Sequence, residues 1–167
     1  MSPITVFILG TIITGIGASL FFDLTSFLRE KIFGVTAPKY GHVGRWIAYM
    51  PRGTFTHETI GKTPAVAGER VLGWTVHYLI GILFAGVLIT FTGVSWFARP
   101  TLWPALTVGI LSVAAPFFIM QPVMGAGIAA SKTPRPWQAR FHSLTNHVSF
   151  GVGLYLAGWA AHYLLGA

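Results

Sequence analysis

The sequence contains no cysteine and very few charged residues. The absence of cysteine excludes disulfide bonds and thiolate metal sites. Charged residues make up only 9% of the 167 residues, whereas a typical soluble domain has about 25%. Because hydrophobic residues make up 53% of the chain, so few charged side chains cannot form a water-exposed surface around the rest. We therefore predict that the lipid bilayer is the solvent of this protein.

Acidic residues are the rarer charged class, since 4 Asp and Glu stand against 11 Lys and Arg and give a net charge of +7. In a soluble protein this excess would suggest a nucleic-acid partner. Here the basic residues gather in segments that connect apolar stretches, so we expect the lipid bilayer, and no nucleic acid, as the partner. Residues 1–4 lack the basic region of a signal peptide, and we expect the first apolar stretch to remain as a helix.

Four uncharged stretches approach or exceed the roughly 20 residues that a helix needs to cross the bilayer. The first of them is long enough only if its helix continues through Asp23 to Leu28. We predict an all-α membrane protein whose single domain, residues 1–167, is a bundle of four transmembrane helices. The predicted spans are approximately residues 4–28, 71–94, 104–124 and 142–165. Pro104, Pro116 and Pro122 interrupt the third span, which predicts a kink or break near Pro116.

The connecting segments differ strongly in basic residues, with seven Lys and Arg in the first, one in the second and three in the third. The positive-inside rule then places the first and third connections in the cytoplasm and both termini outside it. The first connection is a long cytoplasmic loop. Its residues 43–50 mix apolar and aromatic side chains with one cation, which suits a short helix at the membrane interface. An ordered loop across the cytoplasmic mouth of the bundle is the alternative.

The sequence contains two possible internal repeats. The first relates spans two and four at an offset of 70 residues through Arg-x4-Thr-x-His-x3-Gly, which begins at Arg70 and again at Arg140. The second relates the segments that begin at Gly73 and Gly158, but it aligns opposite ends of two spans. We favour the first because it respects the predicted topology. It implies two pseudo-symmetric helical hairpins, an arrangement known from transporters.

Each predicted span carries one polar side chain at a similar depth on the cytoplasmic side. These are Asp23, His77, Gln121 and His147. Ionisable groups within spans are costly, and they normally face the interior of a bundle or a cavity. We therefore predict that these four residues form a polar pocket in the cytoplasmic half of the membrane.

Helix geometry adds basic residues to this predicted pocket. Seven residues make almost two turns, so Arg70 lies below His77 on one helix face, and Arg140 lies below His147 on another. The spacing predicts arginines at the mouth of the pocket, with Glu69 close by. In this hypothesis the arginines attract an anion, while Asp23 and the histidines exchange protons, since histidine titrates near physiological pH.

Several uses of such a pocket remain open. We favour the binding or transport of a small anionic or protonatable solute. The alternatives are a structural or assembly subunit of a homo-oligomer or larger membrane complex, and a haem protein in which His77 and His147 supply both axial ligands. We do not expect an enzyme, because no catalytic motif is present. A metal site stays unknown, since the segment beginning His57-Glu58 does not continue as the zinc motif His-Glu-x-x-His.

Several short segments taken together resemble a family of small bacterial membrane proteins catalogued as domain of unknown function 2938. The segments include Gly15-Ile16-Gly17-Ala18 with Asp23, Gly41-His42-Val43-Gly44-Arg45-Trp46, Gly68-Glu69-Arg70, Gly73-Trp74 with His77-Tyr78, Met120-Gln121-Pro122 and His147 with Phe150-Gly151. The resemblance extends over nearly the whole chain. It implies a bacterial inner-membrane protein with four spans, and it implies no activity, cofactor or catalytic residue.

Overall fold

The computed structural model describes residues 1–166, which form helices and connections without a strand in that range. Four helical stretches are long and apolar enough to cross a membrane, which indicates a membrane protein. Three of them are continuous: α1 (Pro3–Phe33), α3 (Glu69–Thr92) and α6 (Pro136–Leu165). The fourth stretch, Leu102–Val123, contains α4 (Leu102–Leu111), the π-helical turn η4 (Pro116–Met120) and α5 (Gln121–Val123). The predicted all-α class and four candidate spans are confirmed.

The fourth stretch is interrupted where the sequence predicts a break. Helix α4 ends at Leu111, and the chain turns before it continues into η4 at Pro116. Proline has no backbone N–H and its ring clashes with the preceding turn, so an α-helix cannot continue unchanged through this position. The hydroxyl of Ser112 donates a hydrogen bond of 2.6 Å to the carbonyl of Gly109 at the break.

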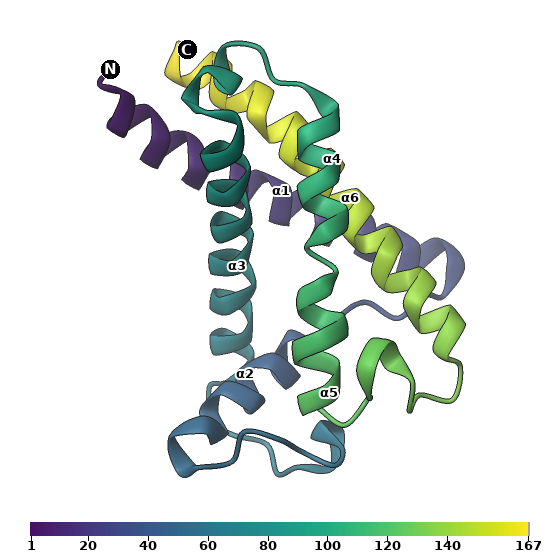
Figure 1. Ribbon diagram of the computed structural model, residues 1–167. Helices are drawn as coiled ribbons and strands as arrows, with labels where there is room; N and C mark the ends of the chain where they lie inside the picture. The colour runs from purple at the N-terminus through teal and green to yellow at the C-terminus, as the bar shows by residue number, and fades with distance from the viewer. Residues whose placement is uncertain (167) are drawn as a thin grey trace.

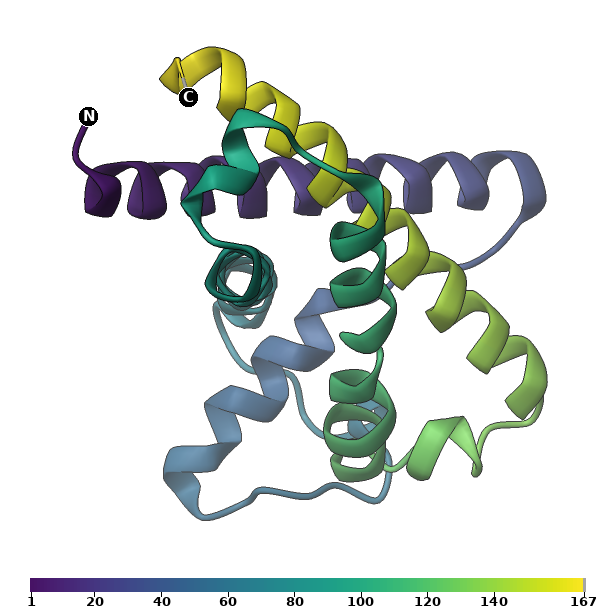
Figure 2. The same cartoon turned by 45° about the horizontal axis from the view of Figure 1, so that its top comes forward.

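The long helices cross at an oblique angle, as the two views of the ribbon show (Figures 1 and 2). Helix α1 packs against both α3 and α6, and α4 packs against α6, whereas α3 and α4 have little direct contact. Glycines allow the close crossings. A Cβ on Gly15 would lie 2.4 Å from Ile82 Cα of α3, and a Cβ on Gly109 would lie 2.4 Å from Gly151 Cα of α6. The arrangement of the helices as two equivalent hairpins stays a prediction.

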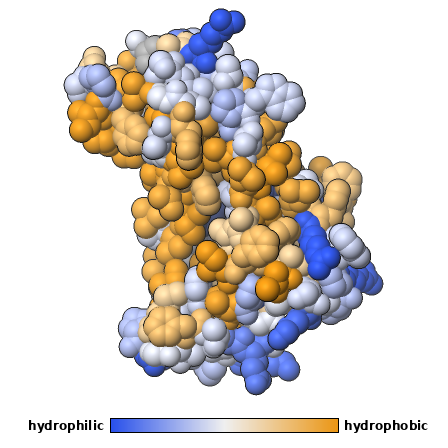
Figure 3. Space-filling view, viewed as in Figure 1, coloured by the Kyte–Doolittle hydropathy of each residue, from blue (hydrophilic) through white to orange (hydrophobic). Residues whose placement is uncertain are grey.

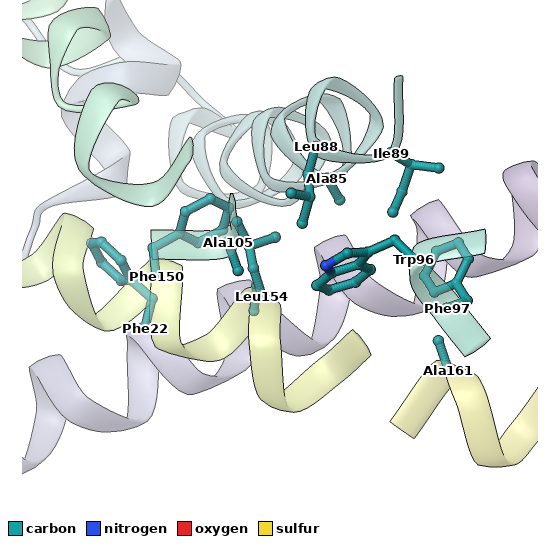
Figure 4. Packing of buried hydrophobic residues seen from close by; sticks show 11 residues of the cluster. Phe22, Ala85, Leu88, Ile89, Trp96, Phe97, Ala105, Phe150, Leu154 and Ala161 are labelled. Atoms are coloured by element: carbon teal, nitrogen blue, oxygen red, sulfur yellow. The ribbon is translucent and has the colours of Figure 1, made fainter. Parts of the chain in front are cut away.

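The hydrophobic core lies between α1, α3, α4, α6 and the short helix η3 (Val94–Ala98), as Figure 4 shows. Helix η3 turns Trp96 and Phe97 back into the core, where Phe97 is completely buried. Two glycines leave room for these rings. A Cβ on Gly10 would lie 2.4 Å from the ring of Phe97, and one on Gly158 would lie 2.4 Å from the ring of Trp96. This packing fixes the end of the molecule that carries the two termini.

The molecule has two distinct ends separated by an apolar band. The N-terminus and the described C-terminal end of α6 lie together at one end (Figure 1), which we call the terminal end. The first and third connections, residues 34–68 and 124–135, lie towards the other end, which we call the basic end because they carry most of the connecting Lys and Arg. Hydrophobic side chains cover the middle of the surface, and hydrophilic ones gather over the basic end (Figure 3).

The first connection forms a folded cover at the basic end. It contains α2 (Tyr40–Tyr49), η1 (Met50–Arg52) and η2 (Ile60–Lys62), so the helix expected over residues 43–50 is present. Helix α2 lies directly against α3, where Gly44 and Gly73 face each other's backbones. Further along, the backbone N–H of His57 donates to the carbonyl of Val123 at 2.7 Å. The connection therefore joins α3 to the end of α5.

Arg45 of α2 holds this connection together. Its guanidinium binds the Glu69 carboxylate through Nε and one Nη, at 2.8 and 2.7 Å. The other Nη donates to the carbonyls of Ile60 and Thr63, at 3.0 and 2.7 Å. The residue is only 9% exposed, and charge-assisted forked bonds of this kind are among the stronger hydrogen bonds in proteins.

Replacing Arg45 with lysine should loosen the first connection, because a single ammonium cannot reproduce the fork and leaves carbonyls unpaired. We expect a loss of about 1–3 kcal/mol in local stability, the usual cost of an unsatisfied buried polar group. Limited proteolysis should then cut within residues 53–68 much faster than in the wild type. Arg52→Lys is the matched control, since Arg52 is exposed and only lies over the Tyr49 ring at 5.1 Å. Equal cleavage of both variants would contradict the role of Arg45.

Candidate functional site

A cavity of about 340 Å³ opens between the helices towards the basic end. Its volume lies at the lower end of the range of about 300–1,000 Å³ that is typical of small-molecule sites. Its polar lining residues are Ser19, Thr36, Lys39, Tyr40, His77, Ser112, Gln121, Ser143, Asn146 and His147. Aromatic and aliphatic side chains, including Phe22, Phe84 and Phe150, form much of the remaining wall. We call this space the basic-end cavity.

His77 lies in a cluster of aromatic rings beside Asp23. Its imidazole stacks on the ring of Tyr40, with centroids 4.1 Å apart and planes 24° apart. Its Nε2 lies 3.2 Å from Asp23 Oδ1, which is close enough for an ion pair, although the angle is not that of a hydrogen bond. The rings of Phe22 and Trp74 pack around the same imidazole. The arrangement fixes the position of His77 at the cavity wall.

The Asp23 carboxylate is stabilised by two tyrosines. Tyr40 donates its hydroxyl to Oδ1 at 2.8 Å, and Tyr78 donates to Oδ2 at 3.1 Å. Burial and the neighbouring carboxylate raise the pKa of Tyr40 above its ordinary value, so this phenol stays protonated and keeps its role as donor. Asp23 itself is not part of the cavity lining. From its position outside the lining, Asp23 holds Tyr40, Tyr78 and His77 in place.

His147 has one ring nitrogen whose role is set by its neighbours. Ser112 Oγ donates its proton to the carbonyl of Gly109, and His147 Nδ1 lies 2.7 Å from the same Oγ. Since the only proton of that hydroxyl is already used, Nδ1 must carry the proton of this contact. In the neutral imidazole, Nε2 is then an acceptor. That atom makes no hydrogen bond to the described residues, and His147 lines the cavity.

The amide side chains of the lining differ in how well they are paired. Arg29 of α1 donates hydrogen bonds to Asn146 Oδ1 and to His142 Nδ1. Because the oxygen of Asn146 accepts from Arg29, its NH₂ group is the part left for the cavity. Gln121 makes one long contact, from Nε2 to Ser143 Oγ at 3.4 Å, and its Oε1 is buried without a partner within residues 1–166.

Four predicted site residues do not line the cavity: Asp23, which lies behind its wall, and three residues at the basic end. Glu69 is bound to Arg45 at 2.7 Å, away from the cavity lining. Arg140 donates to the carbonyl of Ala129 at 2.7 Å and lies over the Trp137 ring. Arg70 is exposed at the start of α3, next to Gly41. The cation at the mouth of the cavity is instead Lys39, with the exposed residues 36 and 38 beside it.

The haem alternative does not fit these contacts. His77 directs Nε2 towards Asp23, and His147 uses Nδ1 on Ser112. The ring of Phe22 packs on both imidazoles, with centroid distances of 5.5 and 6.3 Å. Within residues 1–166, no three His, Asp or Glu side chains gather in a way that could hold a metal ion.

A second cavity of about 500 Å³ lies between α3 and α4, towards the terminal end. Its wall is almost entirely apolar and includes Val87, Leu88, Phe91, Trp103 and Leu111. Phe84 and Ser112 belong to the linings of both cavities. The two spaces therefore meet at these side chains, along the line where α3 and α4 have little contact.

The sequence pattern of the family described as "Protein of unknown function (DUF2938)" matches residues 12–161. The chain belongs to this family. The matched range contains every residue that lines the two cavities. Comparison with curated proteins and with solved structures gives no match.

In this DUF2938 member, several residues of the site carry weak signals in the sequence. Tyr78 follows His77 directly, and its hydroxyl could have been proposed as a partner for Asp23. Ser112 precedes Pro116 by four residues, which marks it as a side chain at a helix break. Tyr40 and Lys39 had no comparable signal, because only the folding of the first connection against α3 brings them to the cavity.

Proposed function

We propose that the protein binds a small solute in the basic-end cavity. The observation that carries this proposal is a cavity within the membrane helices whose wall includes polar atoms without a partner. Ser19 Oγ and Gln121 Oε1 are buried and have no hydrogen-bond partner among the described residues, and both residues line the cavity. Buried polar groups in proteins are normally paired with protein or water. A bound solute, together with water, would satisfy them.

We further propose that the bound solute moves across the membrane. The two cavities meet at Phe84 and Ser112, and a short rotation of the Phe84 side chain would connect them. The wall of this route includes the broken segment between α4 and η4. Transporters use broken helices in the same way, because the irregular backbone lies beside a cavity rather than lipid. His147, with an acceptor nitrogen free, is placed to accept a hydrogen bond from the solute.

The direction of the protein in the membrane follows from its charges. We propose that the basic end lies in the cytoplasm and both termini lie outside it, in a bacterial inner membrane. The distribution of Lys and Arg over the connections supports this orientation. In that orientation the basic-end cavity opens to the cytoplasm at Lys39.

Native mass spectrometry of gently solubilised protein tests the binding site. The wild type should carry a bound molecule, and Ala115→Trp should lose it, because the indole would fill much of the cavity that Ala115 lines. A decrease in affinity of at least about tenfold is expected, which corresponds to about 1.4 kcal/mol. Leu83→Trp is the control, since Leu83 lies on α3, is 63% exposed and lines neither cavity. An unliganded wild type, or unchanged occupancy in Ala115→Trp, would argue against the proposal.

A further inference from the structure

The second cavity has the character of a groove open to lipid. Three of its lining residues are strongly exposed: Phe91 is 84% exposed, Trp103 78% and Leu111 67%. All of them are apolar or aromatic, and in a membrane they face the hydrocarbon core. We call this space the α3–α4 groove. A polar solute would gain no hydrogen bonds along most of its length, whereas a hydrocarbon chain would be in a favourable environment.

The groove continues the basic-end cavity along α3. On α3 the lining runs from His77 through Phe84 to Thr92. Fifteen residues of helix correspond to about 22 Å of rise, which is a large part of the roughly 30 Å hydrocarbon thickness. Along the stretch Leu102–Val123 the lining runs in the opposite chain direction, from Trp103 near the terminal end through Ser112 to Gln121. The combined space is long and narrow, polar at the basic end and apolar at the other.

The polar part of this space favours an anionic group. Among the residues that the structure describes, Lys39 is the only Lys, Arg, Asp or Glu in its lining. Asn146 presents its NH₂ group, because Arg29 occupies its oxygen from outside. The one carboxylate close by, Asp23, is not in the lining and is already bound by two tyrosine hydroxyls. Hydrogen-bond donors and positive charge therefore dominate at the mouth.

We propose that the ligand is a single-chain anionic amphiphile, an inference that rests on the proposed function of the same cavity. Its carboxylate or phosphate head lies at Lys39 and Asn146. Its hydrocarbon chain passes between Phe84 and Ser112 and lies in the α3–α4 groove. A lipid of the leaflet at the basic end has this orientation, with its head at that surface and its chain directed to the middle of the membrane.

Binding of defined probes to the purified full-length protein in detergent tests this inference. Stearate and a lysophosphatidylglycerol of equal chain length carry the two candidate heads, while octanoate and inorganic phosphate lack a long chain. Native mass spectrometry gives the affinity of each probe. We expect at least one long-chain probe to bind about 100-fold more tightly than octanoate, and inorganic phosphate not to bind. If the natural ligand is a fatty acid, the protein should prefer stearate. If it is a phospholipid, the protein should prefer lysophosphatidylglycerol.

Two variants test where the hydrocarbon chain of the ligand binds, and one tests where its head group binds. Phe84→Trp should narrow the passage between the two cavities and decrease the affinity for long-chain probes about tenfold. Thr107→Trp fills the groove from an exposed position, where it cannot disturb the core, and should have the same effect. Lys39→Gln should weaken long-chain probes and octanoate alike. Leu83→Trp, on the lipid-facing side of α3, should change none of these affinities.

The outcomes separate this inference from the function on which it rests. If octanoate binds as tightly as stearate, or if Thr107→Trp keeps the full preference for long chains, the groove is not the chain site and the inference is wrong. Binding of a small molecule that is lost in Ala115→Trp would then still support the proposed function. If neither the probes nor any co-purified molecule binds to the wild type, both proposals fail together.

Discussion

Gly73→Ala should separate α2 from α3, although the same change at Gly86 of this helix should be harmless. A Cβ at position 73 would lie 1.8 Å from the carbonyl oxygen of Tyr40 and 2.5 Å from its carbonyl carbon. These are backbone atoms, so no side-chain rotation relieves the clash. Inserting atoms into a closely packed contact costs about 1–3 kcal/mol and occasionally more. We expect a value at the upper end, because the whole of α2 must move.

The loss of this contact should also open the basic-end cavity. Tyr40 and Val43 of α2 form part of its wall, and Tyr40 donates to Asp23. In Gly73→Ala, proteolysis should cut rapidly within the first connection, and the bound molecule should be lost in native mass spectrometry. Circular dichroism should still show the helices of the four spans, because their packing on one another does not involve position 73.

Gly86→Ala is the matched control on the same helix. A Cβ there would have an ordinary contact of 3.5 Å with Thr11 Cγ2. Alanine is the better helix former by about 1 kcal/mol, so this variant should be as stable as the wild type or slightly more stable. Equal stability of the two variants would show that α2 is not held in place by its contact with α3.

The spans and the break in the third one could be predicted because their signals are local. Hydropathy over about 20 residues is enough to identify a membrane helix, and Pro116 marks the interruption wherever the helix lies. The oblique crossing of α1 had no such signal. It depends on which glycines face each other, such as Gly15 with the backbone at Gly81 and Ile82, and this pairing exists only in the folded molecule.

The predicted arginines at the mouth of the pocket show what helix periodicity cannot predict. The spacing of seven residues places Arg70 and His77 on one face of α3, but it does not say what covers each end of that face. Helix α2 lies against this part of α3, and Arg45 takes Glu69 as its partner. The cation that reaches the cavity, Lys39, belongs to a connection whose path periodicity cannot predict.

The two possible internal repeats of the sequence differ in what they correspond to in the structure. In the match at offset 70, Gly81 and Gly151 each allow a close crossing of another long helix. Their histidines differ, because His77 lies beside Asp23 and His147 beside Ser112. In the other match, Trp74 with Tyr78 and Trp159 with Tyr163 have the same ring geometry, 6.2 Å and 31°. Side chains four residues apart on any helix are neighbours, so this likeness does not require a common origin.

Asp23→Ala should be the most damaging single change within the spans. It would leave the hydroxyls of Tyr40 and Tyr78 without their acceptor and His77 without its charged neighbour. Removing one partner of a buried charged group typically costs about 3–5 kcal/mol. The side chain of Asp23 is 18% exposed, so we expect a loss near 3 kcal/mol in denaturant unfolding. Thr25→Ala on the same helix should cost much less, because that hydroxyl only donates to the carbonyl of Phe22.

A double-mutant cycle tests whether Asp23→Ala acts through its hydrogen bond with Tyr78 or by destabilising α1 in general. Tyr78→Phe alone removes one hydrogen bond to a charged group, worth about 1.5–3 kcal/mol. In the Asp23→Ala background the hydroxyl of Tyr78 has no acceptor, so its removal should be neutral or slightly stabilising. Tyr163→Phe should be neutral in both backgrounds, because Tyr163 occupies the matching position at the terminal end and is 77% exposed. Additive effects of Asp23→Ala and Tyr78→Phe would mean that the carboxylate and the phenol do not act as a pair, and that His77 is held at the cavity wall by ring packing alone.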